Sequence, residues 1–399
     1  MIKIFIGSRI GWCEKIYNYL EVINIKKGFR MMLEIRRVAV IFGGQSTEHE
    51  VSLRSATAII DSINKEKYEV VLIGITKKGK WLLYRGPVEK IADGSWENIA
   101  IEDSKKIRVT KSHENSIRDI FYKIGAETED APIDVIIPAV HGNNCEDGVL
   151  QGVLELSGIP YVGPGVLSSA VCMDKVFAKE MFEKAKIPTC KYLHFMRGYI
   201  EEHELVVINK IKSEIGYPCF VKPANNGSSI GVSKAYNDEE LKEALKLAAL
   251  YDKKILVEEF IDAREVECAV LGNEDPKVAV LGEVISGGDF YDYDFKYKSD
   301  RSRTEIPANI DKEKSDLISE YAKRAFLALN CEGLSRVDFF VQKNTGKIFI
   351  NEINTLPGFT SISMYPKMWE KTGVNNEDLI DKLIEFSVER FKRGKVQTI

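Results

Sequence analysis

The sequence predicts an α/β protein whose first part is a doubly wound domain with a parallel sheet and whose second part has mixed α+β structure. In the first part, continuous apolar runs at residues 38–42, 70–75 and 135–140 are typical of parallel strands buried on both faces. In the second part, a short strand at residues 220–223 and an apolar strand at 255–261 precede two strands, at 335–341 and 347–354, that alternate with period two. The chain is 44% hydrophobic and 29% charged, as in an ordinary globular protein.

The strand at residues 38–42 ends at a Gly-Gly pair, and an apolar stripe with helical spacing follows from Leu53 to Ile63. This β-loop-α opening, followed by two more buried strands, predicts a doubly wound domain over residues 37–163. The polar stretch 84–130 is expected at the periphery of that domain.

Residues 1–36 form an N-terminal extension without turn signals or a single period. Two interpretations stay open. In one, translation starts downstream and the extension is absent from the native protein, because Lys26-Lys27-Gly28 can be encoded by the purine-rich sequence that precedes a bacterial start codon. In the other, residues 13–24 form a short helix that caps the first domain.

Glycine and proline at residues 163–165 mark a domain boundary. We expect a single helix beyond it, which starts at Ser168 and carries Asp174. The strand and loop pattern then divides the remaining chain into a central unit, residues 164–261, and a C-terminal unit, residues 262–399.

Two strands near the C-terminus, joined by a predicted three-residue turn at residues 344–346, place polar side chains together. Period-two alternation puts Arg336 and Asp338 on one face of the first strand, and Glu352 and Asn354 on one face of the second. With this turn, Asp338 faces Glu352 and Arg336 faces Asn354.

The oxygens of Asp, Glu and Asn are the ligands that Mg²⁺ and Mn²⁺ prefer, with water and phosphate oxygens completing the coordination. The hairpin therefore predicts a metal site for a nucleotide. Two alternatives stay open: an ordinary solvated sheet face, or a β-bulge that shifts the register and separates the pairs.

Neither a Walker loop nor a dinucleotide fingerprint occurs in the sequence, so another device must hold the phosphates. The loop at residues 226–231 offers backbone N–H groups and two hydroxyls, and Lys175 and Lys222 supply cations. Such a loop is otherwise an ordinary turn, and the predicted metal site is what favours phosphate binding.

Composition excludes other functional classes. A net charge of −4, from 56 basic and 60 acidic residues, gives no basic surface for nucleic acid. No apolar run approaches the roughly 20 residues of a membrane span. The seven cysteines are scattered, without a C-x-x-C pair. We expect a cytoplasmic protein with reduced cysteines that binds neither nucleic acid nor membranes.

From about residue 37 to residue 390, the chain resembles the D-alanine–D-alanine ligases of the ATP-grasp superfamily. The resemblance rests on blocks that occur in the family's order, at residues 43–52 (GGQSTEHEVS), 141–148 (HGNNCEDG), 226–231 (NGSSIG), 290–297 (FYDYDFKY) and 351–360 (NEINTLPGFT).

This resemblance implies the two-part ATP-grasp fold after the first domain, and the ATP-dependent joining of two D-alanine molecules for peptidoglycan synthesis. One D-alanine carboxylate attacks the γ-phosphate of ATP, and the amine of the second D-alanine attacks the resulting acyl phosphate. The implied cofactors are ATP and two Mg²⁺ or Mn²⁺ ions. D-alanine is the expected substrate, and a homodimer is the expected assembly.

The resemblance also implies roles for single residues. At the substrates lie Glu48, which receives the ammonium of the first D-alanine, His141, Ser363 and Met364, with Ser228 and Tyr297 closing the loop 287–302 over them. At the reacting atoms lie Lys296, Arg336 and the backbone N–H of Gly358. Lys175 and Lys222 hold phosphates, beneath the loop at residues 226–231 that contains Ser228 and Ser229. Glu258 and the backbone of Ile261 bind adenine. Glu259 and Glu265 complete the nucleotide site, with Glu265 at the ribose. Asp338, Glu352 and Asn354 hold the metal ions, with Glu352 bridging them.

Simpler interpretations exist for some of these residues. Glu48 can be an exposed acid before a helix, and His141 a structural residue at a strand end. The acidic residues 258, 259 and 265 can form a solvated edge.

Two features bear on the second substrate. Tyr297 is present, whereas its equivalent is absent from relatives that make D-alanyl-D-lactate, and Met364 stands where D-serine-using relatives have an arginine. We expect D-alanine, although a methyl pocket rejects an added hydroxyl by only about 100-fold. The alternatives are a D-alanine–D-serine ligase, another ATP-grasp carboxylate–amine ligase and a nucleotide-binding subunit without catalysis. A dinucleotide oxidoreductase is disfavoured because the glycine fingerprint is missing.

Overall fold

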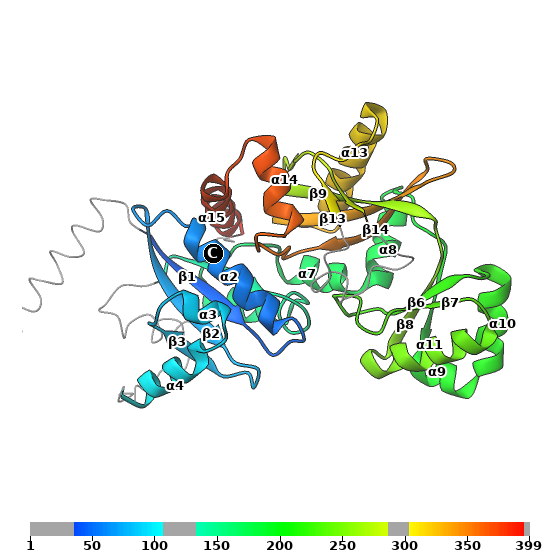
Figure 1. Ribbon diagram of the computed structural model, residues 1–399, viewed down its shortest axis with the longest axis horizontal. Coiled ribbons are helices and arrows are strands. Elements are labelled where there is room, and N and C mark those ends of the chain that lie inside the picture. Colours follow the sequence, from blue (N-terminus) through cyan, green and yellow to red (C-terminus); the bar gives the residue numbers. More distant parts are fainter. Residues whose placement is uncertain (1–35, 107–132, 286–302, 395–399) are drawn as a thin grey trace, which may run out of the picture.

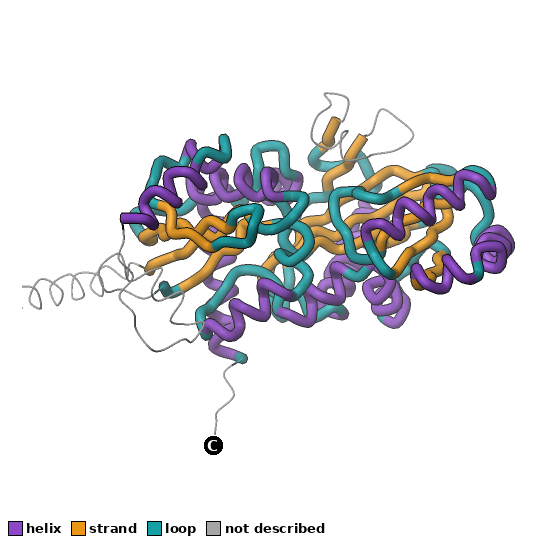
Figure 2. The backbone as a smooth tube through the Cα atoms, turned by 90° about the horizontal axis from the view of Figure 1, so that it is seen from below, coloured by secondary structure: helices purple, strands orange, loops and turns teal. Residues whose placement is uncertain are grey.

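The computed structural model describes residues 36–106, 133–285 and 303–394. Within these ranges the strands form three sheets, and Figure 1 labels the elements. Figure 2 shows the strands running through the middle of an elongated molecule, with helices on both sides. No helix in the described ranges combines the length and the apolar character that a bilayer crossing requires.

The N-terminal sheet has the strand order β3-β2-β1-β4, in which β2, β1 and β4 are parallel and β3 is antiparallel. Its elements are β1 (Arg36–Gly43), α2 (His49–Ser62), β2 (Tyr68–Ile75), β3 (Trp81–Tyr84) and β4 (Val135–Val140). The three predicted parallel strands are confirmed. Every residue of β1 after Arg36 is buried, as expected of a strand covered on both faces.

The expectation that residues 84–130 are peripheral holds only in part for the described part of this stretch, because most of its side chains are exposed or half-buried while a few belong to the core. It forms α3 (Glu89–Ala92) and α4 (Trp96–Lys106), and Trp96 is only 1% exposed. The Trp96 ring lies edge-on to Phe42, with centroids 4.9 Å apart. Gly74 makes this packing possible, since an added Cβ there would lie 2.1 Å from the indole. Residues 107–130 lie outside the described residues.

The second sheet is antiparallel, with the order β5-β8-β6-β7. Apolar side chains of its helices and strands form one core cluster. The elements are β5 (Tyr192–Met196), α9 (Arg197–Glu202), α10 (Glu204–Glu214), β6 (Cys219–Pro223), β7 (Ser233–Ala235), α11 (Asp238–Tyr251) and β8 (Lys254–Glu259).

The third sheet has the order β12-β11-β9-β13-β14, with β10 paired to β9, and it is antiparallel throughout. Its elements are β9 (Ala263–Gly272), β10 (Lys277–Val278), β11 (Gly282–Ile285), β12 (Arg303–Glu305), α13 (Lys312–Ala328), β13 (Gly333–Gln342) and β14 (Ile348–Asn354). Two helices follow, α14 (Met364–Thr372) and α15 (Asn376–Arg393), and α15 packs against α2 and β4 of the N-terminal domain.

Three helices connect the first sheet to the second along the chain. They are α6 (Val149–Ser157), α7 (Val166–Met173) and α8 (Lys175–Lys184). The predicted single helix from Ser168 is wrong, because Asp174 separates α7 from α8. The Asp174 backbone is extended, and its side chain accepts hydrogen bonds from the N–H groups of Val176 and Phe177. An aspartate that caps the next helix in this way ends the preceding one.

Candidate active site

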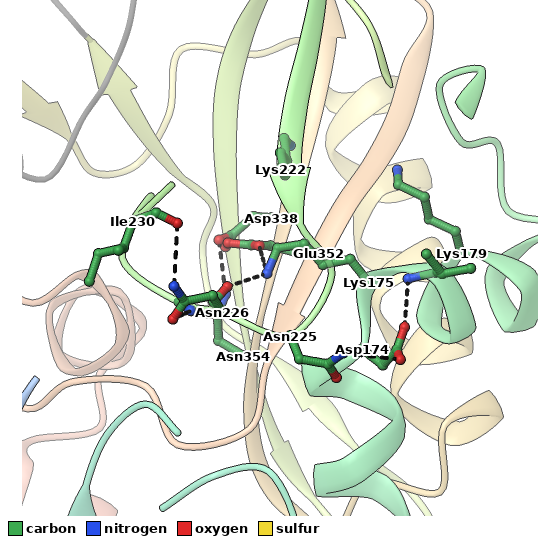
Figure 3. A network of polar contacts seen from close by, with 12 residues as sticks. Asp174, Lys175, Lys179, Lys222, Asn225, Asn226, Ile230, Asp338, Glu352 and Asn354 are labelled. Atoms are coloured by element: carbon green, nitrogen blue, oxygen red, sulfur yellow. Dashed lines mark hydrogen bonds and ion pairs between the residues drawn. The ribbon is translucent and has the colours of Figure 1, made fainter. Parts of the chain in front are cut away.

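The β13–β14 hairpin brings the predicted metal ligands together. Arg336 pairs with Asn354, and Asp338 pairs with Glu352, as predicted. Asn354 Nδ2 donates a hydrogen bond to Asp338 Oδ2 at 3.0 Å. Figure 3 shows Asp338, Glu352 and Asn354 side by side, close to Asn226 of the loop at residues 226–231.

The turn of this hairpin differs from the prediction. Gln342 N–H donates to Lys347 O, so the turn spans residues 343–346, one residue more than predicted. A register shift between Asp338 and Phe339 compensates for the extra residue. The predicted pairing is therefore wrong near the turn and correct at the polar residues.

The Arg336 guanidinium is bound on two sides by carboxylates. Its Nε and Nη2 donate to the two Asp338 oxygens at 2.8 and 2.7 Å, and its Nε lies 3.1 Å from Glu267 Oε2. Burial alone would lower the pKa of Arg336, but Asp338 and Glu267 raise it well above its usual value. Arg336 is therefore a fixed cation on this face of the sheet.

Glu267 is a site residue that the sequence analysis does not predict. It lies on β9 in register with Asp338, so a carboxylate row crosses β9, β13 and β14. The sequence does contain a signal for Glu267, because period-two alternation places it on the same strand face as Glu265, which is a predicted site residue. In the described part of the chain, no group of three or more His, Cys, Asp or Glu side chains has an arrangement that holds a metal ion.

The loop at residues 226–231 reaches the N-terminal domain. Ser228 Oγ donates a hydrogen bond to Glu48 Oε1, across 180 positions of sequence. Ser228 and Ser229 have φ angles of 52° and 56°, a left-handed conformation that is uncommon outside glycine. Lys175 Nζ donates to Asn226 O at 2.8 Å and lies 3.5 Å from Glu352 Oε2. The loop thus connects Glu48 to the β13–β14 hairpin.

Glu48 is 7% exposed and immediately precedes α2, so the structure rules out the interpretation of a freely exposed acid. Gly142 lies against its carboxylate, with a φ of 79°, and an added Cβ would lie 2.6 Å from Glu48 Oε2. Only glycine fits this position, because both the space and the backbone angle exclude a side chain.

His141 is buried at the end of β4 and uses both ring nitrogens. Nδ1 lies 3.0 Å from the Leu356 carbonyl oxygen and Nε2 lies 2.9 Å from Ser55 Oγ. Because a carbonyl only accepts, Nδ1 carries the proton and Nε2 accepts from the Ser55 hydroxyl. Burial lowers the pKa of His141, although the nearby Glu48 raises it in part. His141 is thus a neutral link between β4 and the segment after β14.

The lowered pKa of His141 predicts a pH effect on stability. The folded-state pKa lies below the unfolded value of about 6.5, so this contribution to stability is present above pH 6.5 and is lost as the pH falls through the folded-state pKa. We expect the melting temperature of the unmodified protein to fall more steeply than that of His141→Asn between pH 7 and pH 5. The exposed His203→Asn should keep the slope of the unmodified protein, and equal slopes for all three proteins would contradict the assignment.

Two cavities contain the predicted site residues. The first, of about 160 Å³, is lined among others by Glu48, His141, Arg336, Asn354, Gly358, Ser363 and Met364. The second, of about 280 Å³, is lined among others by Lys222, Ser229, Glu258, Glu259, Ile261, Glu265 and Asp338. Lys175, Ser228 and Glu352 line both. Every predicted site residue within the described ranges therefore lines one cavity or the other.

The acidic residues around the second cavity are not a solvated edge in every case. Glu258 is 3% exposed and forms ion pairs with Lys179 and Lys222. Glu259 is half-buried, and its Oε1 accepts a hydrogen bond from the Lys191 N–H at 2.7 Å. The solvated interpretation is therefore wrong for Glu258.

Glu146 is a second residue of the first cavity for which the sequence analysis gives no role. Burial, together with the charge of Glu48, raises the pKa of Glu146 to about 8. The side chain is therefore largely uncharged at neutral pH, which reduces the negative charge beside Glu48. Two predicted residues, Lys296 and Tyr297, lie outside the described residues, as does the extension over residues 1–35.

Comparison with known proteins gives consistent matches over both parts of the chain. The family model described as the D-ala D-ala ligase N-terminus matches residues 37–164, and the model of the C-terminus matches residues 181–385. A D-alanine–D-alanine ligase of Acetivibrio thermocellus is 53% identical over 364 residues, which are 89% of this chain and 96% of the relative. One of Ruminiclostridium cellulolyticum is 53% identical over 363 residues, with coverages of 90% and 96%.

Solved structures agree with this result. The D-Ala:D-Ser ligase VanG from Enterococcus faecalis has a TM-score of 0.76 and 40% identity, and the match covers 88% of this chain and 99% of that one. The D-alanine–D-alanine ligase from Coxiella burnetii has a TM-score of 0.74 and 34% identity, with coverages of 90% and 96%. These neighbours confirm the predicted fold class, a parallel-sheet α/β domain followed by the two-part ATP-grasp fold. The chain belongs to the D-alanine–D-alanine ligase family.

Proposed function

We propose that this protein is an ATP-dependent ligase that joins two D-alanine molecules to D-alanyl-D-alanine, a peptidoglycan precursor, with release of ADP and phosphate. The observation that carries the proposal is the meeting of the two cavities at Lys175, Ser228 and Glu352. A nucleotide in the second cavity then presents its terminal phosphate to a carboxylate in the first. The 53% identity to D-alanine–D-alanine ligases supports this choice of reaction.

In the first cavity, Glu48 receives the ammonium of the first D-alanine, and His141 keeps the segment that contains Gly358 in place through Leu356. The Gly358 N–H donates to the oxyanion of the tetrahedral intermediate. An added Cβ on Gly358 would lie 2.9 Å from Ser363 Oγ, so a larger residue here would press against the serine that lines the same cavity. Arg336 neutralises charge on the transferring phosphoryl group, together with Lys296.

In the second cavity, Lys175 and Lys222 bind phosphates beneath the loop that contains Ser228 and Ser229. Adenine binds to Glu258 and to the backbone of Ile261. Glu259 and Glu265 complete the site, with Glu265 at the ribose. Tyr297 joins Glu48 and Ser228 in closing the site against water, which protects an acyl phosphate from hydrolysis.

Two Mg²⁺ or Mn²⁺ ions would be held by Asp338, Glu352 and Asn354, because their oxygens suit hard divalent cations. The donor set suits such ions, since Asp338 faces Glu352 across the hairpin and Asn354 lies within hydrogen-bond distance of Asp338. When bound, the ions supply charge neutralisation to the phosphate oxygens.

D-alanine is the proposed second substrate as well as the first. Met364 is 6% exposed and lines the first cavity beside Ser363, which makes that wall apolar and suited to a methyl group. A D-serine ligase is the second candidate, because VanG, a D-Ala:D-Ser ligase, is 40% identical to this chain.

The experiment is an incubation of the purified protein with ATP, Mg²⁺ and D-alanine, alone or mixed with D-serine or D-lactate. We expect D-alanyl-D-alanine and one ADP per dipeptide, with the D-serine product reduced by about 100-fold at equal concentrations. Mass spectrometry identifies the products. A preponderance of D-alanyl-D-serine would establish the second candidate, and ATP hydrolysis without dipeptide would refute both.

Three further proposals concern the whole chain. We propose that its units are residues 37–163, 164–261 and 262–399, that it forms a homodimer, and that it acts in the cytoplasm. Light scattering of the purified protein measures the assembly.

A further inference from the structure

Lys179 is a fully buried charged residue for which the proposed function gives no role. It lies on α8, one turn after Lys175, and its side chain is 1% exposed. Among the described residues that line the second cavity are Glu258 and Lys222, but Lys179 is not one of them. An ammonium group without contact to water or ligand must be explained by its protein partners.

The partner of Lys179 is Glu258. Lys179 Nζ lies 2.6 Å from Glu258 Oε1, while Lys222 Nζ lies 2.5 Å from Glu258 Oε2. Cys190 completes the group, since its Sγ lies 3.4 Å from Lys179 Nζ and 3.5 Å from Glu258 Oε1. Burial raises the pKa of Cys190 to about 11, so this thiol is neutral. One carboxylate thus faces two ammonium groups, one on each oxygen.

The two lysines differ in their access to the second cavity. Lys222 lines the second cavity and can turn to a nucleotide phosphate, whereas Lys179 is enclosed behind Glu258. If Lys222 were the only counter-ion, its departure would leave a buried carboxylate unpaired, which is strongly unfavourable. With Lys179 in place, the departure of Lys222 leaves a neutral buried pair and one free carboxylate oxygen.

We propose that Lys179 is a positioning residue that keeps Glu258 charged and fixed, so that Lys222 can move from Glu258 to the ATP phosphates while Glu258 Oε2 accepts a hydrogen bond from the 6-amino group of adenine. The inference rests on the proposed function in that it takes ATP as the nucleotide. It adds that Lys179, through Glu258, determines the preference for a 6-amino purine. Burial alone would raise the pKa of Glu258, but Lys179 and Lys222 hold it well below its usual range, so Glu258 acts as an acceptor.

The test compares ATP with inosine triphosphate, which has a carbonyl oxygen in place of the 6-amino group. A charged Glu258 accepts from the amino group and repels the carbonyl oxygen. For Lys179→Met, we expect the KM for ATP to rise by roughly 10- to 100-fold and the ATP-to-inosine-triphosphate ratio of kcat/KM to fall by a similar factor, with kcat at saturating ATP nearly unchanged. Lys179→Arg should recover part of the selectivity, because it keeps the charge.

The matched control is Lys184→Met, which removes an exposed lysine from the same helix. It should leave the KM for ATP and the ATP-to-inosine-triphosphate ratio of kcat/KM unchanged. A second variant separates positioning from folding: in Glu258→Gln, a further Lys179→Met change should add little to the KM, because the buried carboxylate that Lys179 serves is gone. If Lys179→Met alone does not fold, this double variant still folds under the proposal, since it contains no unpaired buried charge.

Two results would overturn the inference: an unchanged nucleotide ratio in Lys179→Met, or a full additive effect of Lys179→Met in the Glu258→Gln background. Failure of the proposed function is distinct, because it is an absence of dipeptide with the unmodified protein. Titration calorimetry measures the affinities of each variant for ATP and for inosine triphosphate without turnover. It therefore decides the role of Lys179 even if the reaction is another one.

Discussion

Glu352→Gln is expected to lower turnover by roughly a hundred- to a thousand-fold while the protein remains folded. Glu352 lies at the junction of the two cavities, opposite Asp338 in the hairpin and 3.5 Å from Lys175 Nζ. The amide keeps the shape of the side chain but removes the negative charge that binds a divalent cation. Since the proposed ions neutralise the phosphate oxygens as the acyl phosphate forms, their loss acts on the chemical step.

The measurement is steady-state dipeptide formation at several Mg²⁺ and Mn²⁺ concentrations, with melting temperature as the check on folding. The Asp275→Asn variant makes the same acid-to-amide change in the exposed turn between β9 and β10 and should behave as the unmodified protein. Turnover of Glu352→Gln that returns to the unmodified level at saturating Mg²⁺ would reduce the residue to one that only tunes affinity. Unchanged turnover at every metal concentration would remove it from the metal site.

The hairpin illustrates which parts of the site follow from local sequence. Period-two alternation correctly predicts that Arg336 and Asp338 share a face and that Asn354 lies opposite Arg336. The length of the turn could not be predicted in this way, because the strand contains a compensating register shift. The shift lies next to Ile350. The Ile350 N–H bonds to Pro188 O, in a segment far away in sequence. A local pattern cannot contain a contact of that kind.

The same limit applies to the meeting of the two cavities. Strands β1, β2 and β4 could be predicted from their apolar runs, since each is buried over most of its length. The contact between Glu48 and Ser228 joins the N-terminal domain to the second sheet, and no periodicity within either segment predicts it. Only the resemblance to a known family placed these two residues together. The sequence does not indicate the buried position of Lys179, because a lysine one turn after another lysine is usually on a solvated helix face.

Arg336→Lys is expected to lower kcat by roughly a hundred- to a thousand-fold. The guanidinium makes two parallel bonds with Asp338 and a third contact with Glu267, and it is 18% exposed at the wall of the first cavity. Lysine keeps the charge but has a single ammonium group that cannot form the two parallel bonds. The cation is then no longer held at a fixed place, and the charge on the transferring phosphoryl group is less well neutralised. Because binding of ATP depends chiefly on other residues, the KM for ATP should change much less than kcat.

Arg264→Lys is the matched control for this prediction. Arg264 also forms two bonds with one carboxylate, at 2.6 Å each to Glu283, and it lies on the same sheet outside both cavities. Both variants therefore lose a bidentate pair, and their melting temperatures should fall by similar amounts. If only Arg336→Lys loses turnover, the loss reflects the position of Arg336 beside the reacting groups. If both variants lose turnover equally, the pairs serve the sheet alone, and Arg336 has no direct part in the reaction.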